Sequence, residues 1–503
     1  DVPAAIRREK QIKDLRPFAS LRVTTSMTTV PETAPVTAPR VELPRVLTLR
    51  DLVLFNIVAV LSLRWTATAA AAGPSSLTMW VLAALLFFIP QGLAVSHLAA
   101  RYPQEGGIYF WTKRAFGEGH GFLCGWCYWV NNILYYPNLL MSTAVIATYA
   151  IGRSQTGLMD DWTYIFAATL TSLWLAVLLN IVGLKTGRWL QNLGALGTYL
   201  PGLVLIGFGF HAALTRGSAT PITLDTITPD LSDMSALNLW ASIAFAYAGL
   251  ELCAVMGDEI KNPRRTLPRS IYIAAPLIAF LYIAGTASVL WLVPSSEVHV
   301  VSGFFQAMAA GARDLGGLGW IIPLAAALYV LGNIGGIGAW LTGPARVAFV
   351  IGLDRYFPPA FGRVHPRWKT PYVAILTQAV LATVFLMLSV LGKGTTVEKA
   401  YLILLDTMLL IYFIPYIYLF ICYLVVRSKE TGAEAQAWYG GRIAGWIIGF
   451  AGLLLTLGAM TVATIPPTDT AEPWIFRLKV IGGAGLFVIL GGVVFWRGRR
   501  TAR

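Results

Sequence analysis

The chain has 503 residues, of which 56% are hydrophobic and 13% are charged. This composition excludes an ordinary soluble globular protein, in which about 25% of residues are charged. The formal net charge of +13 could indicate nucleic-acid binding, but the chain contains no soluble basic module with interspersed aromatic residues. The excess of Lys and Arg instead follows the arrangement of apolar segments.

Residues 1–45 are polar and contain prolines at positions 31, 35, 39 and 44. A segment of this kind cannot bury a core, so we predict a disordered N-terminal tail on the cytoplasmic side. It has no apolar run, so it is not a signal peptide.

Apolar runs of about 20 residues, each long enough to cross a bilayer as a helix, recur through the rest of the chain. We predict twelve transmembrane helices, at residues 49–71, 77–99, 121–150, 162–182, 189–212, 236–257, 271–293, 318–341, 372–391, 401–426, 443–464 and 475–496. The fold class predicted is therefore an all-α integral membrane protein.

Lys and Arg are concentrated in alternate loops between these segments. The loop after the sixth segment, for example, carries Lys261, Arg264, Arg265 and Arg269. Basic loops remain on the cytoplasmic side of a membrane. The distribution predicts a multi-pass protein of a bacterial-type cytoplasmic membrane, with both termini in the cytoplasm.

The first and sixth segments are interrupted, at residues 62–66 (SLRWT) and 245–251 (FAYAGLE). Paired interruptions five helices apart are typical of a five-plus-five inverted repeat with a binding site at the bilayer midplane. We therefore expect a ten-helix transport core at 46–427, made of repeats 46–212 and 236–427. Residues 428–503 would add helices eleven and twelve and a short cytoplasmic tail.

Two charged residues lie inside these interrupted segments. Arg64 is near the membrane centre, where an arginine costs about 2.5–3.5 kcal/mol on insertion scales, and Glu251 is similarly unfavourable. Arg64 could extend its guanidinium to the membrane surface. The preferred interpretation is that it faces a cavity and is compensated by Glu251, by a substrate carboxylate, or by both.

Other polar and small residues have simpler interpretations. The cysteines and histidines show no metal-ligand spacing, and no nucleophile–base set is visible, so we expect no metal, no cofactor and no enzymatic activity. The glycines between Gly332 and Gly338 indicate close helix packing or a substrate-facing surface. Tyr412 and Tyr416 are core aromatics or gate residues.

Four motifs resemble those of the amino acid–polyamine–organocation transporter family. They are residues 101–109 (RYPQEGGIY), residues 179–185 (LNIVGLK), residues 245–251 with 259–269 (EIKNPRRTLPR), and residues 343–349 (GPARVAF) with 353–359 (LDRYFPP). They occur in the family's order over about 46–427. A looser resemblance is to bacterial glutamate/GABA antiporters.

This resemblance implies a leucine-transporter-type fold with discontinuous helices 1 and 6, whose exposed backbone binds the substrate. The family's aromatic gate in helix 6 would be Phe245, and Thr198 falls where some members have a proton-coupling Lys. Residues 62–66 lack the usual small-residue break. The expected substrate-binding residues are Ser62, Leu63, Arg64, Trp65, Thr66, Phe245, Ala246, Tyr247, Ala248, Gly249, Glu251, Asn333 and Ile337.

The predicted function is secondary active transport of amino acids by alternating access, as an exchanger or a proton symporter. The charge of Arg64 favours neutral or acidic substrates over cationic ones. A transporter of polyamines or other cationic amines, and a substrate-sensing receptor on the same scaffold, are the alternatives. The expected partners are the small-molecule substrate, the bilayer and protons, with no nucleic acid.

Overall fold

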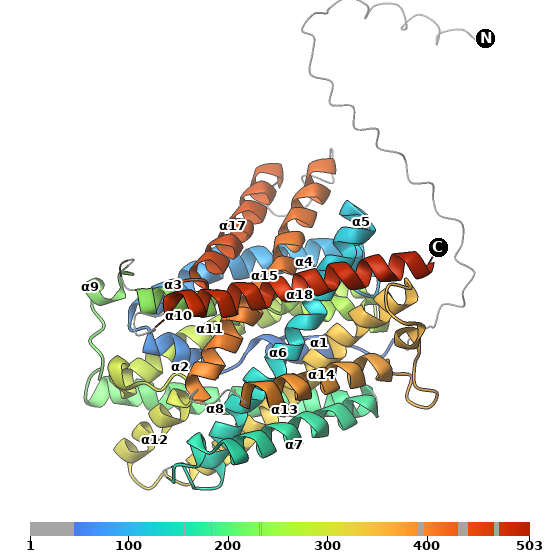
Figure 1. The fold of residues 1–503 in the computed structure, drawn as a ribbon. Helices are drawn as coiled ribbons and strands as arrows, with labels where there is room; N and C mark the ends of the chain where they lie inside the picture. The colour runs from blue at the N-terminus through green and yellow to red at the C-terminus, as the bar shows by residue number, and fades with distance from the viewer. Residues whose placement is uncertain are drawn as a thin grey trace, which may run out of the picture. The chain divides into compact units, whose positions relative to one another are not determined.

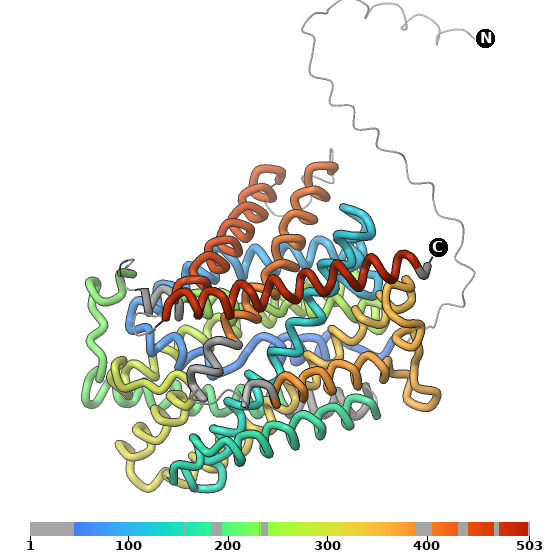
Figure 2. Tube along the Cα trace, viewed as in Figure 1, coloured from blue at the N-terminus to red at the C-terminus, as the bar shows by residue number. Residues whose placement is uncertain are grey.

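The computed structural model describes residues 45–502, apart from 155, 183, 231, 233, 391–396, 431–440 and 467–471. The predicted disordered tail therefore lies almost entirely outside the described residues. Figures 1 and 2 show the helices of the unit Leu43–Arg503.

The α-helices are α1 (Leu49–Val60), α2 (Arg64–Ala71), α3 (Ser75–Ala83), α4 (Ile89–Arg101), α5 (Ile108–Phe116), α6 (Glu118–Ala150), α7 (Trp162–Ile181), α8 (Leu184–Thr215), α9 (Leu224–Ile227), α10 (Met234–Ala246), α11 (Pro263–Leu292), α12 (Gly303–Leu315), α13 (Ile321–Leu353), α14 (Tyr372–Val390), α15 (Val397–Lys429), α17 (Gly441–Val462) and α18 (Pro473–Ala502). The π-helix η1 (Ala84–Phe88) joins α3 to α4, and η3 (Leu250–Glu259) is a 3-10 helix; shorter 3-10 turns are η2 (Leu158–Asp160), η4 (Ser295–Glu297) and η5 (Pro359–Gly362). Among the described residues, the one β contact is an isolated parallel bridge between Leu47 and Ile260.

Each of the twelve predicted segments coincides with a helix or with consecutive helical pieces. Ten helical stretches in the described part of the chain have the length and apolar composition needed to cross a membrane. The other two predicted segments correspond to α6, which carries Asn131, Asn132 and Asn138 in its middle, and to the shorter apolar helix α14. The ends differ most at α13, which continues to Leu353 rather than to 341.

Both interrupted segments are broken, as predicted. The first is extended at Leu61, and its second half begins at Arg64, so Trp65 and Thr66 are already helical. The other break separates α10 from η3 at Gly249, whose φ of +129° is a conformation that favours glycine. A Cβ at Gly249 would also lie 3.2 Å from Val60 Cγ2.

Side chains from neighbouring helices satisfy the backbone groups that the breaks release. The Tyr282 hydroxyl accepts a hydrogen bond from Ser62 N at 3.0 Å and lies 2.5 Å from Val60 O and 3.2 Å from Ala246 O. Trp340 Nε1 donates to Ala59 O at 3.0 Å. Non-helical backbone at membrane depth requires such partners, because lipid provides none.

The broken helices are central and the last two helices are peripheral. Buried residues make up 89% of the most apolar stretch of α1–α2 and 100% of that of α10–η3, against 28% for α17 and 17% for α18. Figure 1 shows α18 running across the front of the bundle and α17 rising at the upper left beside α15. The lipid-facing surface is therefore provided to a large extent by the C-terminal helices.

Helices α8 and α13 pack closely through glycines. A Cβ at Gly197 would lie 2.2 Å from Leu328 O, and one at Gly332 would lie 2.7 Å from Thr198 Oγ1. This confirms close helix packing for Gly332. No side chain larger than hydrogen fits at these positions unless the helices separate.

Candidate binding site between the broken helices

Five aromatic side chains and Arg64 form a closed circuit beside the two breaks, which we term the aromatic circuit. Its ring centroids are separated by 5.7 Å (Trp65–Phe245), 5.6 Å (Phe245–Tyr412), 5.7 Å (Tyr412–Trp340) and 5.0 Å (Trp340–Tyr135). The Arg64 guanidinium carbon closes it, at 5.7 Å from the Tyr135 ring and 4.4 Å from the Trp65 ring. These residues come from α2, α6, α10, α13 and α15, and each is at most 6% exposed.

Arg64 is fully buried, so its side chain does not extend to the membrane surface. Its Nη1 donates to Asn138 Oδ1 at 2.6 Å, and its backbone N donates to the Tyr329 hydroxyl at 3.1 Å. The residue is also the first of α2. The guanidinium charge therefore lies at the positive end of the half-helix dipole.

Glu251 is fully buried directly after the other break, as the second residue of η3. Its carboxylate accepts hydrogen bonds from the hydroxyls of Tyr412, Tyr416 and Tyr128 and from Gln91 Nε2. The predicted pairing of Glu251 with Arg64 is therefore wrong. Neutral O–H and N–H donors compensate this carboxylate, because side chains from α4, α6 and α15 reach it.

The Tyr412 and Tyr416 side chains connect this carboxylate to the rest of the site. Tyr412 contributes its ring to the aromatic circuit and its hydroxyl to Glu251. The Tyr416 hydroxyl contacts the other carboxylate oxygen and accepts a hydrogen bond from Gly249 N at 2.7 Å. Both tyrosines therefore link Glu251 to the break between α10 and η3.

The structure brings some of the expected site residues together and places others apart. Tyr247 faces away from the aromatic circuit, since its ring stacks on Phe88 at 4.4 Å and contacts Trp80 at 5.0 Å. Asn333 donates to Thr143 Oγ1 at 2.8 Å, on α6. Thr198 bonds to Gly194 O within its own helix, at 3.0 Å, and packs against α13.

The remaining expected residues are buried around the breaks. Thr66 Oγ1 donates to Leu63 O at 2.6 Å, and the Leu63 side chain packs near Gly202 of α8. Ser62 lies next to the Tyr282 hydroxyl. The other buried residues of the expected set are Ala246, Ala248 and Ile337.

Sequence reasoning missed several residues of this site. Gln91 and Asn138 are polar residues inside apolar segments, and that signal could have identified them. Tyr128, Tyr135 and Trp340 carried no comparable signal, because buried aromatic residues are common in membrane helices.

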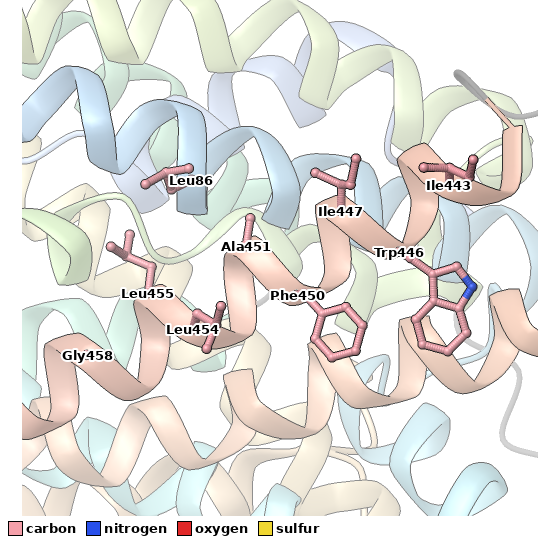
Figure 3. A pocket seen from close by; sticks show the side chains of 9 residues that line it. All are labelled: Leu86, Ile443, Trp446, Ile447, Phe450, Ala451, Leu454, Leu455 and Gly458. Carbon is pink, nitrogen blue, oxygen red and sulfur yellow. The ribbon is translucent and has the colours of Figure 1, made fainter.

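A separate apolar cavity of about 840 Å³ lies between η1 and α17 (Figure 3). Its lining residues are Leu86, Ile443, Trp446, Ile447, Phe450, Ala451, Leu454, Leu455 and Gly458. Several of them are strongly exposed, such as Ile443 at 76% and Leu454 at 66%. This cavity lies on the peripheral, lipid-facing side and shares no residue with the aromatic circuit.

Two broken helices with a buried polar site between them are the architecture of a membrane transporter. The sequence pattern described as "Amino acid permease" matches residues 47–486. The chain therefore belongs to the amino acid permease family, and it is a multi-pass secondary transporter.

Relatives of known sequence agree with this assignment. An uncharacterized transporter of Legionella pneumophila, lpg1691, is 32% identical over 89% of this chain and 96% of its own length. A probable agmatine/putrescine antiporter, AguD, of Lactococcus lactis is 27% identical over 69% and 73%. The glutamate/gamma-aminobutyrate antiporter of Lactococcus lactis is 25% identical over 78% of each chain.

The fold is that of the leucine-transporter type, as the resemblance implied. The crystal structure of MhsT in complex with L-phenylalanine matches with a TM-score of 0.58, over 90% of this chain and 100% of that chain, at 14% sequence identity.

Proposed function

We propose that the protein exchanges amino acids across the cytoplasmic membrane, with neutral or acidic substrates preferred. The substrate α-carboxylate would bind at Arg64 and the N-terminus of α2, where a guanidinium and a half-helix dipole favour negative charge. The aromatic circuit would enclose the remainder of the substrate. The observation that carries this proposal is the closed arrangement of Arg64 and five aromatic rings beside both breaks.

Transport would proceed by alternating access around this site. The circuit is buried from both membrane faces, which fits a state closed on both sides. Substrate release requires one side to open, and a ligand shifts that equilibrium only by its differential affinity for the two states. Exchange is favoured over symport by the antiporter descriptions of AguD and of the glutamate/gamma-aminobutyrate protein.

A cationic amine is the second candidate substrate. The buried Glu251 carboxylate and the aromatic rings favour it, because both attract cations. The Arg64 charge opposes it, because like charges repel strongly in a site of low dielectric constant. Because AguD is described as a probable agmatine/putrescine antiporter, cationic amines must be included in any substrate screen.

The proposal also includes the orientation of the chain in the membrane and its division into two repeats. Both termini would be cytoplasmic, residues 46–427 would form the transport core as repeats 46–212 and 236–427, and α17 and α18 would lie outside the repeat. No enzymatic step is included in the proposed function.

Purified protein in liposomes tests the substrate class. Liposomes preloaded with one unlabelled compound are given the same compound radiolabelled outside, across neutral, acidic and cationic amino acids and common diamines. Accumulation of label with neutral or acidic amino acids is expected. Accumulation with diamines alone would establish the cationic alternative, and saturable binding with no uptake would identify a receptor.

A further inference from the structure

Three charged side chains lie buried together on the face that the Lys and Arg distribution predicts to be cytoplasmic. Glu105 is in the loop 102–107, Glu259 ends η3, and Arg346 is in α13. They are 9%, 1% and 4% exposed, respectively. All three belong to the sequence motifs noted above, and none of them belongs to the aromatic circuit. We term them the inner triad.

The contacts of the inner triad are unequal. Arg346 Nε forms a short ion pair with Glu259 Oε1, whereas its distance to Glu105 Oε1 is 3.5 Å. Arg346 Nη1 donates to Thr342 O at 2.8 Å, and Asp258 N donates to Glu105 Oε2 at 3.3 Å. Glu105 Oε1 and Glu259 Oε2 are buried and accept no hydrogen bond from the described part of the chain.

The charges of the inner triad do not balance when both carboxyl groups are ionised. Two carboxylates would then share one guanidinium, and an uncompensated buried charge costs several kcal/mol. The charged groups that face Glu105 are Glu259 and the exposed Asp258 from η3, and Arg346 from α13. Burial, and then the charge of Glu259, raises the pKa of Glu105 well above its ordinary value.

The inner triad lies where several segments close one face of the bundle. Gly106 N donates to Val255 O at 3.0 Å, which ties the loop 102–107 to η3. The extended segment before α1 is tied to η3 as well, since Leu47 N donates to Glu259 O at 3.1 Å. Opening this face must separate η3 from at least one of these partners, and water then reaches the carboxyl groups.

We propose that Glu105 is a proton-binding site that is occupied while this face is closed and is emptied when the face opens. On opening, hydration lets both carboxyl groups ionise, and the Glu105 proton passes to the solution on that side. On closing, a proton from the same side is bound again, so acid on that side stabilises the closed face. This inference rests on the proposed alternating-access function.

Exchange measured against lumenal pH tests the site in liposomes whose protein orientation is known. With the predicted cytoplasmic face inward, exchange by the unaltered protein should slow as lumenal pH falls, by up to tenfold per pH unit for a single proton. Glu105→Gln, which is neutral at every pH, should exchange at the slow acidic rate without this dependence. Glu118→Gln alters an exposed carboxyl group on the same face, and this variant should retain the dependence of exchange on lumenal pH.

Glu259→Gln provides a second, opposite test. With only one carboxylate left beside Arg346, Glu105 should stay ionised to lower pH. The slowing of exchange should therefore begin at a lower lumenal pH than in the unaltered protein. The proposal would be overturned if the exchange rate of Glu105→Gln depended on lumenal pH as that of the unaltered protein does. It would also be overturned if the dependence in Glu259→Gln occurred at the same pH as in the unaltered protein.

Thermal unfolding separates this inference from the proposed function, because it requires no transport. A carboxyl group whose folded-state pKa is raised contributes stability at low pH, which is lost as pH rises through that pKa. Between pH 8 and pH 5 the unaltered protein should therefore gain melting temperature relative to Glu105→Gln. An equal change in melting temperature in the unaltered protein and in Glu105→Gln would refute the proton site. A lack of uptake of every substrate would refute only the transport proposal. If Glu105→Gln does not fold, the Glu259→Gln shift in the same melting profile is the test.

Discussion

At the scale of single residues, the two buried charges beside the breaks contact neutral hydrogen-bonding groups and, for Arg64, aromatic rings. Arg64 is bonded to Asn138 and lies over Trp65, while Glu251 is surrounded by tyrosine hydroxyls and Gln91. Both charges therefore lie beside the broken helices, next to the aromatic circuit.

Arg64→Ala should weaken the binding of amino acids that carry a carboxylate. A hydrogen bond to a charged group contributes about 1.5–3 kcal/mol, which corresponds to a rise in KM of roughly 10- to 100-fold. Arg64→Lys keeps the charge but loses the planar fork, so an intermediate KM is expected. The measurement is exchange in liposomes at varied substrate concentration, and an unaltered KM in Arg64→Ala would remove Arg64 from the site.

Phe245→Ala should raise KM and speed loss of bound substrate, because the Phe245 ring contacts both Trp65 and Tyr412 and so joins two sides of the aromatic circuit. Folding should be largely retained, as shown by a monodisperse elution profile. The retention time of radiolabelled substrate on the purified protein is the direct measurement. If retention matches that of the unaltered protein, Phe245 is ordinary packing and not a gate.

At the scale of helices, each break depends on side chains from other helices. One hydroxyl, that of Tyr282 in α11, contacts backbone groups of both the first and the second broken helix. This common contact holds the two breaks beside each other, so that Trp65 and Phe245 can meet.

Tyr282→Phe should lower the free energy of unfolding by about 1–3 kcal/mol, since it leaves buried backbone groups without a partner. Tyr247→Phe is the matched control. The Tyr247 hydroxyl is buried close by and has no hydrogen-bond partner among the described residues, so its loss should cost little. Thermal unfolding of both variants makes the comparison, and equal melting temperatures would contradict the role assigned to Tyr282.

At the scale of the whole molecule, the distribution of Lys and Arg predicts which face is cytoplasmic. The inner triad and the basic loop after η3 would lie on that face, and the loops on either side of α9 would lie on the other.

Single cysteines test this orientation in intact cells, in a background in which the four buried native cysteines are replaced. A cysteine at Thr223 should react with a membrane-impermeant reagent from outside. One at Arg363 should react only after the cells are opened. The reverse pattern would invert the topology and place the proton site of Glu105 on the outer face.

Residue order alone located the twelve apolar segments that coincide with helices, both broken segments and the family, but it did not predict the shorter helices α5 and α12. These features depend on local properties, namely the length of apolar runs, the placement of basic residues and the contiguous motifs. The sequence also singled out Arg64 and Glu251, because charge inside an apolar run is visible without a structure. Only the tertiary structure decided their partners and the membership of the aromatic circuit. Tyr135, Trp340 and Tyr412 are far apart in the chain, and their contacts depend on how α6, α13 and α15 pack around the breaks.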